Sequence, residues 1–179
     1  KSLLDLSNKF QLLPIGGCWI KDEDIKPHKK SKLCSIISSE KNITFGHRLR
    51  HESINKFSRW IDVFGRGYNP IDYKLDGLKE YSFSIIIENH KEDYYFTEKL
   101  IDCFATGTIP IYWGCPSIGN FFDEGGIIQF NDLRDLEHIF DTISDSQYIP
   151  PIRSIIENLE KSKDYLTAED TLYKIINEK

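Results

Sequence analysis

The sequence lacks several features that define common classes of protein. It contains no Met and only two Ala, and its four cysteines include no CxxC pair. Without an initiator Met, we expect a fragment or a processed product of a longer chain. Scattered cysteines favour free thiols over a disulfide framework. No run approaches the roughly 20 apolar residues that cross a bilayer, so we expect no transmembrane segment.

The charge balance is mildly acidic, with 23 Lys and Arg against 28 Asp and Glu and a net charge of −5. Nucleic-acid affinity rests on a cationic surface, so we expect no nucleic-acid partner. Hydrophobic residues make up 40% of the chain and aromatics 13%, which indicates a folded protein. The 179 residues are enough for one domain or one lobe of a larger enzyme.

Residues 1–30 differ from the rest of the chain. They carry turn signals at Pro14 and Gly16 and an acidic cluster at Asp22–Asp24. The cluster has the spacing of a DxD metal motif, but it does not follow a buried strand, so we interpret it as a solvated turn. We therefore predict a connector over residues 1–30 and a folded domain over residues 31–179.

The domain alternates between strand and helix patterns. Strands are predicted at Leu33–Ser38, Trp60–Phe64, Tyr81–Glu88, Thr108–Trp113 and Gly126–Phe130. Helices are predicted at Gly46–Arg59 and Thr97–Thr106, followed by three with spaced apolar residues near the end of the chain. This alternation predicts an α/β fold, with a mostly parallel sheet and helices on both faces. Ligands bind such sheets beyond the carboxyl ends of the strands.

The densest group of candidate site residues follows the third predicted strand. A helix N-terminus there favours a phosphate, and Lys99 adds a positive charge. Glu98 can accept hydrogen bonds from sugar hydroxyls. A surface helix with solvated charges is the alternative interpretation. The group comprises Glu88, Asn89, Tyr95, Thr97, Glu98 and Lys99.

A second candidate is the helix start after the first strand, which carries Arg48 and Arg50. The planar guanidinium donates two parallel hydrogen bonds and suits a phosphate. A basic, solvated helix start is the alternative. His47 and His51 have the i, i+4 spacing of a metal pair, but no HExxH pattern accompanies them, so no metal site is expected.

At these residues the sequence resembles a known family. The segment from Phe83 to Leu133 is similar to the carboxyl-terminal, donor-binding lobe of family 10 glycosyltransferases, the α-1,3/1,4-fucosyltransferases. The motifs that carry the resemblance are Glu88-Asn89, Tyr95, Thr97-Glu98-Lys99, Ile109-Pro110-Ile111 and Gly114-x-Pro116. The likeness covers about Lys32 to Leu133.

The resemblance implies the carboxyl-terminal, Rossmann-like lobe of a GT-B enzyme that uses GDP-fucose. The phosphate-binding Arg of the family matches Arg50 best, with Arg48 as its rival. Glu98 is implied to lie near sugar and ribose, and Lys99 on the diphosphate. The other positions implied to line the donor pocket are Glu88, Asn89, Tyr95 and Thr97.

The resemblance also implies the reaction, which is an inverting transfer of L-fucose to a glycan hydroxyl without metal or cofactor. The family's general base and its acceptor site lie in an amino-terminal lobe, of which residues 1–30 can supply only the end. We therefore expect the isolated chain to bind donor but to be inactive.

Two alternatives stay open: a transferase for another nucleotide sugar, and a non-catalytic module that binds nucleotide or glycan. We expect a cytoplasmic or peripheral membrane location for a bacterial or viral source, and the family implies the Golgi lumen for a eukaryotic one.

Overall fold

The computed structural model describes residues 13, 16–144, 150–165 and 167–177. A five-stranded sheet lies at its centre, and every pair of neighbouring strands is parallel. The strands are β1 (Lys32–Ile37), β2 (Ile61–Phe64), β3 (Tyr81–Ile87), β4 (Ile109–Trp113) and β5 (Ile128–Gln129). The α-helices are α1 (Phe45–Phe57), α2 (Glu98–Ala105), α3 (Leu133–Ser144), α4 (Ile152–Ser162) and α5 (Ala168–Asn177).

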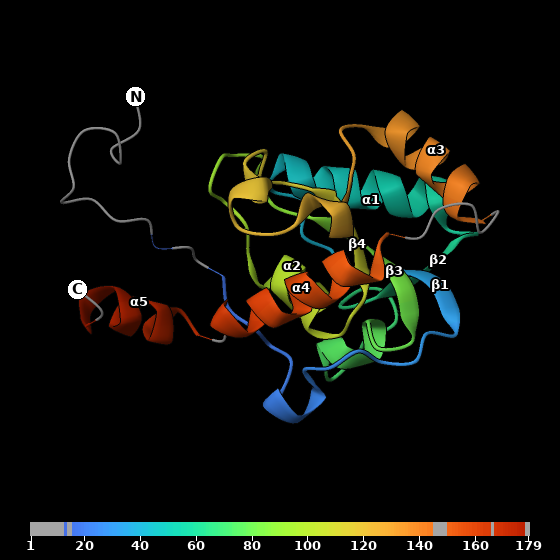
Figure 1. Cartoon of the computed structure of the whole chain (residues 1–179). Coiled ribbons are helices and arrows are strands. Elements are labelled where there is room, and N and C mark those ends of the chain that lie inside the picture. Colours follow the sequence, from blue (N-terminus) through green and yellow to red (C-terminus); the bar gives the residue numbers. More distant parts are fainter. Residues whose placement is uncertain (1–12, 14–15, 145–149, 166, 178–179) are drawn as a thin grey trace.

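Helices cover both faces of the sheet (Figure 1). α1 and α3 pack on one face, where Leu49, Phe57 and Phe140 meet the side chains of β1, β3 and β4. α2 packs on the other face, where Leu100 and Phe104 meet the alternate side chains of β3 and β4. α4 lies beside α2. The predicted α/β class with a parallel sheet and two helical layers is confirmed.

The sequence explains the two central strands. Ile85–Ile87 is buried on both faces of β3, as parallel strands require. β4 contains Pro110, which cannot donate to a strand ladder. β5 pairs only with Ile111 and Tyr112, so Pro110 lies outside that ladder.

The strand predicted at Gly126–Phe130 is shorter in the structure. β5 contains only Ile128 and Gln129, and Gly126 instead belongs to the 3-10 turn η5 (Glu124–Gly126). The short loops contain further 3-10 turns, which are η2 (Asp22–Asp24), η3 (Lys74–Gly77), η4 (Ile118–Asn120) and η6 (Lys163–Tyr165). None of the residues of η2 is buried, so the acidic cluster forms a surface turn.

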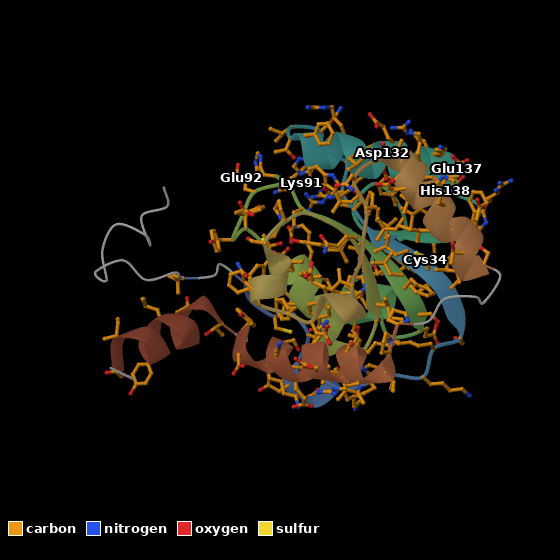
Figure 2. All side chains as sticks on the ribbon, turned by 45° about the horizontal axis from the view of Figure 1, so that its top comes forward. Cys34, Lys91, Glu92, Asp132, Glu137 and His138 are labelled. Carbon is orange, nitrogen blue, oxygen red and sulfur yellow. The ribbon has the colours of Figure 1, made fainter. Side chains whose placement is uncertain are left out.

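Figure 2 shows Cys34 inside the molecule, whereas Glu137 and His138 lie on the outer surface of α3. All four cysteines are free thiols. Burial raises the pKa of Cys34 and Cys103.

Within the described ranges, no helix has both the length and the apolar character that a membrane crossing requires.

The strand order β2-β1-β3-β4-β5 creates a topological switch point between β1 and β3. From β1 the chain passes through α1 to β2 on one side. β3 lies on the other side of β1 and leads through α2 to β4. The loops after β1 and β3 therefore diverge toward opposite faces, which leaves a crevice at the carboxyl ends of these strands.

Candidate functional site

A cavity of about 470 Å³ lies at this crevice, lined by residues from the ends of β1, β2 and β3, from α1 and from the start of α2. Its lining is unusually rich in charge. Four cationic and three anionic side chains contribute, namely Arg50, Arg66, Lys74 and Lys99, with Asp72, Glu98 and Asp102. A site of this kind can bind a ligand that carries both negative charge and hydroxyl groups.

Arg50 is fixed at the end of β3. Its side chain extends from α1 and the residue is 5% exposed. Nε donates to the Ile87 carbonyl at 2.9 Å, and Nη2 donates to Asn89 Oδ1 at 2.6 Å. Burial lowers the pKa of Arg50, while nearby Glu88 and Glu98 act in the opposite direction. The guanidinium is therefore held in one orientation against the cavity.

Arg48 lies two residues earlier on α1 and is exposed. Its guanidinium carbon is 6.0 Å from the centre of the Phe45 ring. Residues i and i+2 do not share a face of a helix. The structure therefore brings Arg50, and not Arg48, to the cavity.

The start of α1 is placed by a capping box. Thr44 Oγ1 accepts from the His47 N–H at 3.2 Å, and the Thr44 N–H donates to His47 Nδ1 at 3.1 Å. Gly46 allows this turn to touch the end of β3, because a Cβ there would lie 1.8 Å from the Glu88 carbonyl oxygen. Burial lowers the pKa of His47. His47 thus serves as a cap in the described structure.

The start of α2 is organised by Glu88, whose side chain is fully buried. Its carboxylate accepts from the Thr97 N–H at 2.9 Å and from the Thr97 hydroxyl at 2.7 Å. Lys99 Nζ contacts the same carboxylate at 3.3 Å. Thr97 occupies the N-cap position, but its hydroxyl makes no capping bond to the helix, because it donates to Glu88 instead.

Lys99 has a structural partner as well as a place at the cavity. A cation in the first turn of a helix is unfavourable by itself. Its charge is balanced by Glu88 and by Glu98, whose Oε1 is 3.4 Å from Nζ. The Lys99 side chain is still 25% exposed, and the residue lines the cavity.

Glu98 lies between two ammonium groups, those of Lys99 and Lys74, each 3.4 Å from Oε1. Burial alone would raise the pKa of Glu98, but Lys99, Lys74 and a hydrogen bond with Thr97 outweigh it and hold the pKa below its usual value. Glu98 is therefore an ionised hydrogen-bond acceptor at the cavity.

The remaining predicted residues lie behind the cavity or beside it. Asn89 accepts from Arg50 and so orients the guanidinium. Tyr95 is partly buried, with its ring 6.2 Å from that of His90, and burial raises its pKa. Tyr94 holds the same loop in a left-handed conformation at φ 64°, which is rare for a residue other than Gly. Figure 2 shows Lys91 and Glu92 on the outer surface of this loop.

Sequence reasoning missed several cavity residues, among them Trp19, Lys74 and Asp102. One signal was available for Asp102, which follows Glu98 by one helical turn among the apolar residues of α2. Trp19 and Lys74 lie in irregular segments and carry no such signal. Within the described ranges, no group of three or more His, Cys, Asp or Glu side chains could hold a metal ion.

The parallel sheet, its two helical layers and the cavity at the switch point define the class of the fold, which is a Rossmann-like α/β domain. A crystal structure of an α1,3-fucosyltransferase with GDP superimposes with a TM-score of 0.55, at 23% identity, over 84% of this chain and 48% of that one. A crystal structure of an α1,3-fucosyltransferase with GDP-fucose gives a TM-score of 0.51, at 24% identity, over 76% of this chain and 48% of that one.

The sequence comparison then identifies the family. The pattern of the C-terminal region of glycosyltransferase family 10 (fucosyltransferase) matches residues 26–147, so the chain belongs to this family. The α-(1,3)-fucosyltransferase FucT of Helicobacter pylori is 36% identical over 77 residues, which are 43% of this chain and 16% of that enzyme. The chain thus spans less than half the length of these relatives.

Proposed function

We propose that this chain is the donor-binding domain of an inverting fucosyltransferase, which transfers L-fucose from GDP-fucose to a glycan hydroxyl when joined to an acceptor lobe. The observation that carries the proposal is the placement of Arg50, Glu98 and Lys99 around one cavity at the switch point of the sheet. Membership of family 10 supports it, as do the neighbours crystallised with GDP and GDP-fucose.

Each predicted residue except Arg48 has a role in this proposal. Arg50 and Lys99 bind the diphosphate, together with the first-turn amides of α2. Glu98 accepts hydrogen bonds from ribose or fucose hydroxyls. Glu88 and Thr97 hold Lys99 and the start of α2, Asn89 orients Arg50, and Tyr95 supports the loop between them.

In the proposed reaction, the oxygen of the acceptor hydroxyl forms a bond to the anomeric carbon of fucose. The bond from that carbon to the β-phosphate oxygen breaks, and GDP leaves with its electron pair. Arg50 and Lys99 stabilise the negative charge that develops on the leaving diphosphate. A general base in the acceptor lobe takes the hydroxyl proton, so the isolated chain binds donor but transfers little or no fucose.

Calorimetry of the isolated chain tests donor binding directly. We expect heat with GDP and with GDP-fucose, and a much weaker signal for the Lys99→Ala variant. A folded chain that gives no heat with either nucleotide would overturn the proposal. In a two-lobe enzyme, faster transfer from GDP-mannose would indicate another nucleotide sugar, and binding without any transfer would indicate a non-catalytic module.

A further inference from the structure

Lys74, in η3, contacts two carboxylates of α2 and the ring of Trp19, which comes before β1. Its Nζ lies 2.8 Å from Asp102 Oδ2 and 3.4 Å from Glu98 Oε1. The same ammonium group lies 4.2 Å from the centre of the Trp19 ring. All four residues line the cavity.

Asp102 determines where Lys74 can lie. Its side chain is 1% exposed, and a buried carboxylate is costly unless it is paired and hydrogen-bonded. The backbone N–H of Trp19 donates to Asp102 Oδ1 at 2.6 Å, and Lys74 Nζ donates to Asp102 Oδ2. Asp102 therefore anchors Lys74 on one side, and the Trp19 ring restricts it on another through a cation–π contact.

Lys74 and Lys99 both contact the same oxygen of Glu98, Oε1. Two cations at one oxygen restrict the rotation of the carboxylate about its own axis. Lys99 directly follows Glu98 in α2, whereas Lys74 belongs to η3 and approaches the carboxylate from outside the helix. Without Lys74, the carboxylate would keep only one of these two restraints.

We propose that Lys74, anchored by Asp102 and Trp19, is a positioning residue that orients the Glu98 carboxylate toward the hydroxyl groups of the bound donor. This inference rests on the proposed function, because it assigns Glu98 to a hydroxyl-bearing donor. Lys74 acts here through Glu98 and not as a ligand of the diphosphate.

The environment of Glu98 gives this role a distinctive pH dependence. The charged and titratable groups around it are Lys74 and Lys99, Arg50 from α1, the carboxylates of Glu88 and Asp102, and the Tyr95 phenol. Burial raises the pKa of Glu98, and Lys74, Lys99 and the hydrogen bond with Thr97 lower it. Without Lys74, only Lys99 and Thr97 oppose the effect of burial to a large extent, so the pKa of Glu98 rises. A raised pKa means that the ionised acceptor is lost at a higher pH than in the native chain.

The experiment compares the native chain with Lys74→Met by calorimetry between about pH 5 and pH 8. The ligands are GDP-fucose, GDP and inorganic pyrophosphate. We expect affinity for both nucleotides to fall by about tenfold, the size of one lost hydrogen bond to a charged group, and to fall further at the acidic end. Affinity for pyrophosphate should stay unchanged, and Lys74→Arg should restore nucleotide binding.

Two further variants separate positioning from folding. Lys79→Met removes a half-exposed lysine near η3 that pairs with Asp76, and it should bind all three ligands like the native chain. The double variant Lys74→Met/Asp102→Asn removes the buried Asp102 carboxylate together with its ammonium partner, so no unpaired buried charge remains and the protein should be stable. It should show the same loss of affinity for GDP and GDP-fucose as Lys74→Met.

Equal losses for pyrophosphate and nucleotides, or a pH profile parallel to that of the native chain, would overturn the positioning role while leaving the proposed function intact. Absence of nucleotide binding by the native chain would instead refute the proposed function itself. The two failures are therefore distinguishable.

Discussion

At the scale of single residues, the structure separates two arginines that the sequence left as rivals. Arg50 donates to the end of β3 and to Asn89, whereas Arg48 is exposed beside Phe45. Only Arg50 has the burial and the fixed orientation that let a guanidinium stabilise a developing charge without reorganisation. The two positions therefore form a matched pair for mutation.

We predict that Arg50→Ala lowers the kcat of the two-lobe enzyme by about 10²–10³, the range for loss of one preorganised donor. Arg48→Ala should leave kcat within about twofold, because an exposed cation contributes little. Steady-state kinetics with GDP-fucose measure both. Similar losses in the two variants, or normal turnover by Arg50→Ala, would contradict the assignment of Arg50.

Residue types at predicted strand ends were enough to nominate Arg50, Glu98 and Lys99 among the charged side chains that line the cavity. Glu88, Asn89 and Lys99 could be found because the carboxyl ends of parallel strands converge. Lys74 and Trp19 could not, because they lie in segments without periodicity, whose paths depend on tertiary packing. The partnership of Lys99 with Glu88 was also missed, since Lys99 was interpreted as the ligand of an external phosphate or as a solvated side chain.

At the scale of elements, α2 is fixed at both ends. Glu88 holds its first turn, and Lys30 holds its last. Lys30 Nζ donates to the Thr106 carbonyl at 2.9 Å, to the Lys79 carbonyl at 3.2 Å and to Thr108 Oγ1 at 2.8 Å. A cation at this end also complements the helix dipole. The position of Glu98 and Lys99 thus depends on groups outside the helix.

We expect Lys30→Met to lower the free energy of unfolding by about 1–3 kcal/mol, because buried acceptors lose their donor. Urea denaturation measures this change. Lys29→Met, at the neighbouring exposed position, is the control and should be neutral within about 0.5 kcal/mol. A neutral Lys30→Met would show that Lys30 does not hold the end of α2.

The contact between α1 and β3 gives a second prediction at this scale. Gly46→Ala places a Cβ against the Glu88 carbonyl oxygen, so the first turn of α1 must move. We expect a loss of about 1–3 kcal/mol in unfolding free energy, as for other overpacked sites, together with weaker GDP binding.

Gly119→Ala is the control for Gly46→Ala, because the three atoms nearest the new Cβ all belong to the flexible Glu124 side chain and not to the backbone. Urea denaturation and calorimetry with GDP measure the two effects on both variants. Native stability and affinity in Gly46→Ala would contradict the close approach of α1 to β3.

At the scale of the whole molecule, the alternation of patterns predicted the fold class but not the strand order. A helical crossover can place the next strand beside the preceding strand on either of its two edges within the sheet. The position of β3 next to β1, which creates the crevice, is determined by packing of the β3 core against both neighbours. The general location of the site followed from the sequence, whereas its actual walls required the structure.

The proposed mechanism predicts that transfer by the two-lobe enzyme does not require a divalent ion. Arg50, Lys99 and the start of α2 already supply positive charge to the leaving diphosphate. Assays of fucose transfer with and without a chelator should give the same kcat within about twofold. A chelator-induced loss that Mn²⁺ or Mg²⁺ restores would contradict this prediction.

Residues 16–30 pack on the domain and do not lie apart from it. Ile20 is buried against Leu78 and Ala105, the Trp19 N–H bonds Asp102, and the His28 N–H bonds the Thr106 carbonyl. Chimaeras that exchange lobes between family members must therefore place their crossover point before residue 16. A junction at residue 31 would combine one parent's α2 with foreign contacts at Asp102 and Thr106, and we expect such hybrids to displace the helix and with it Glu98.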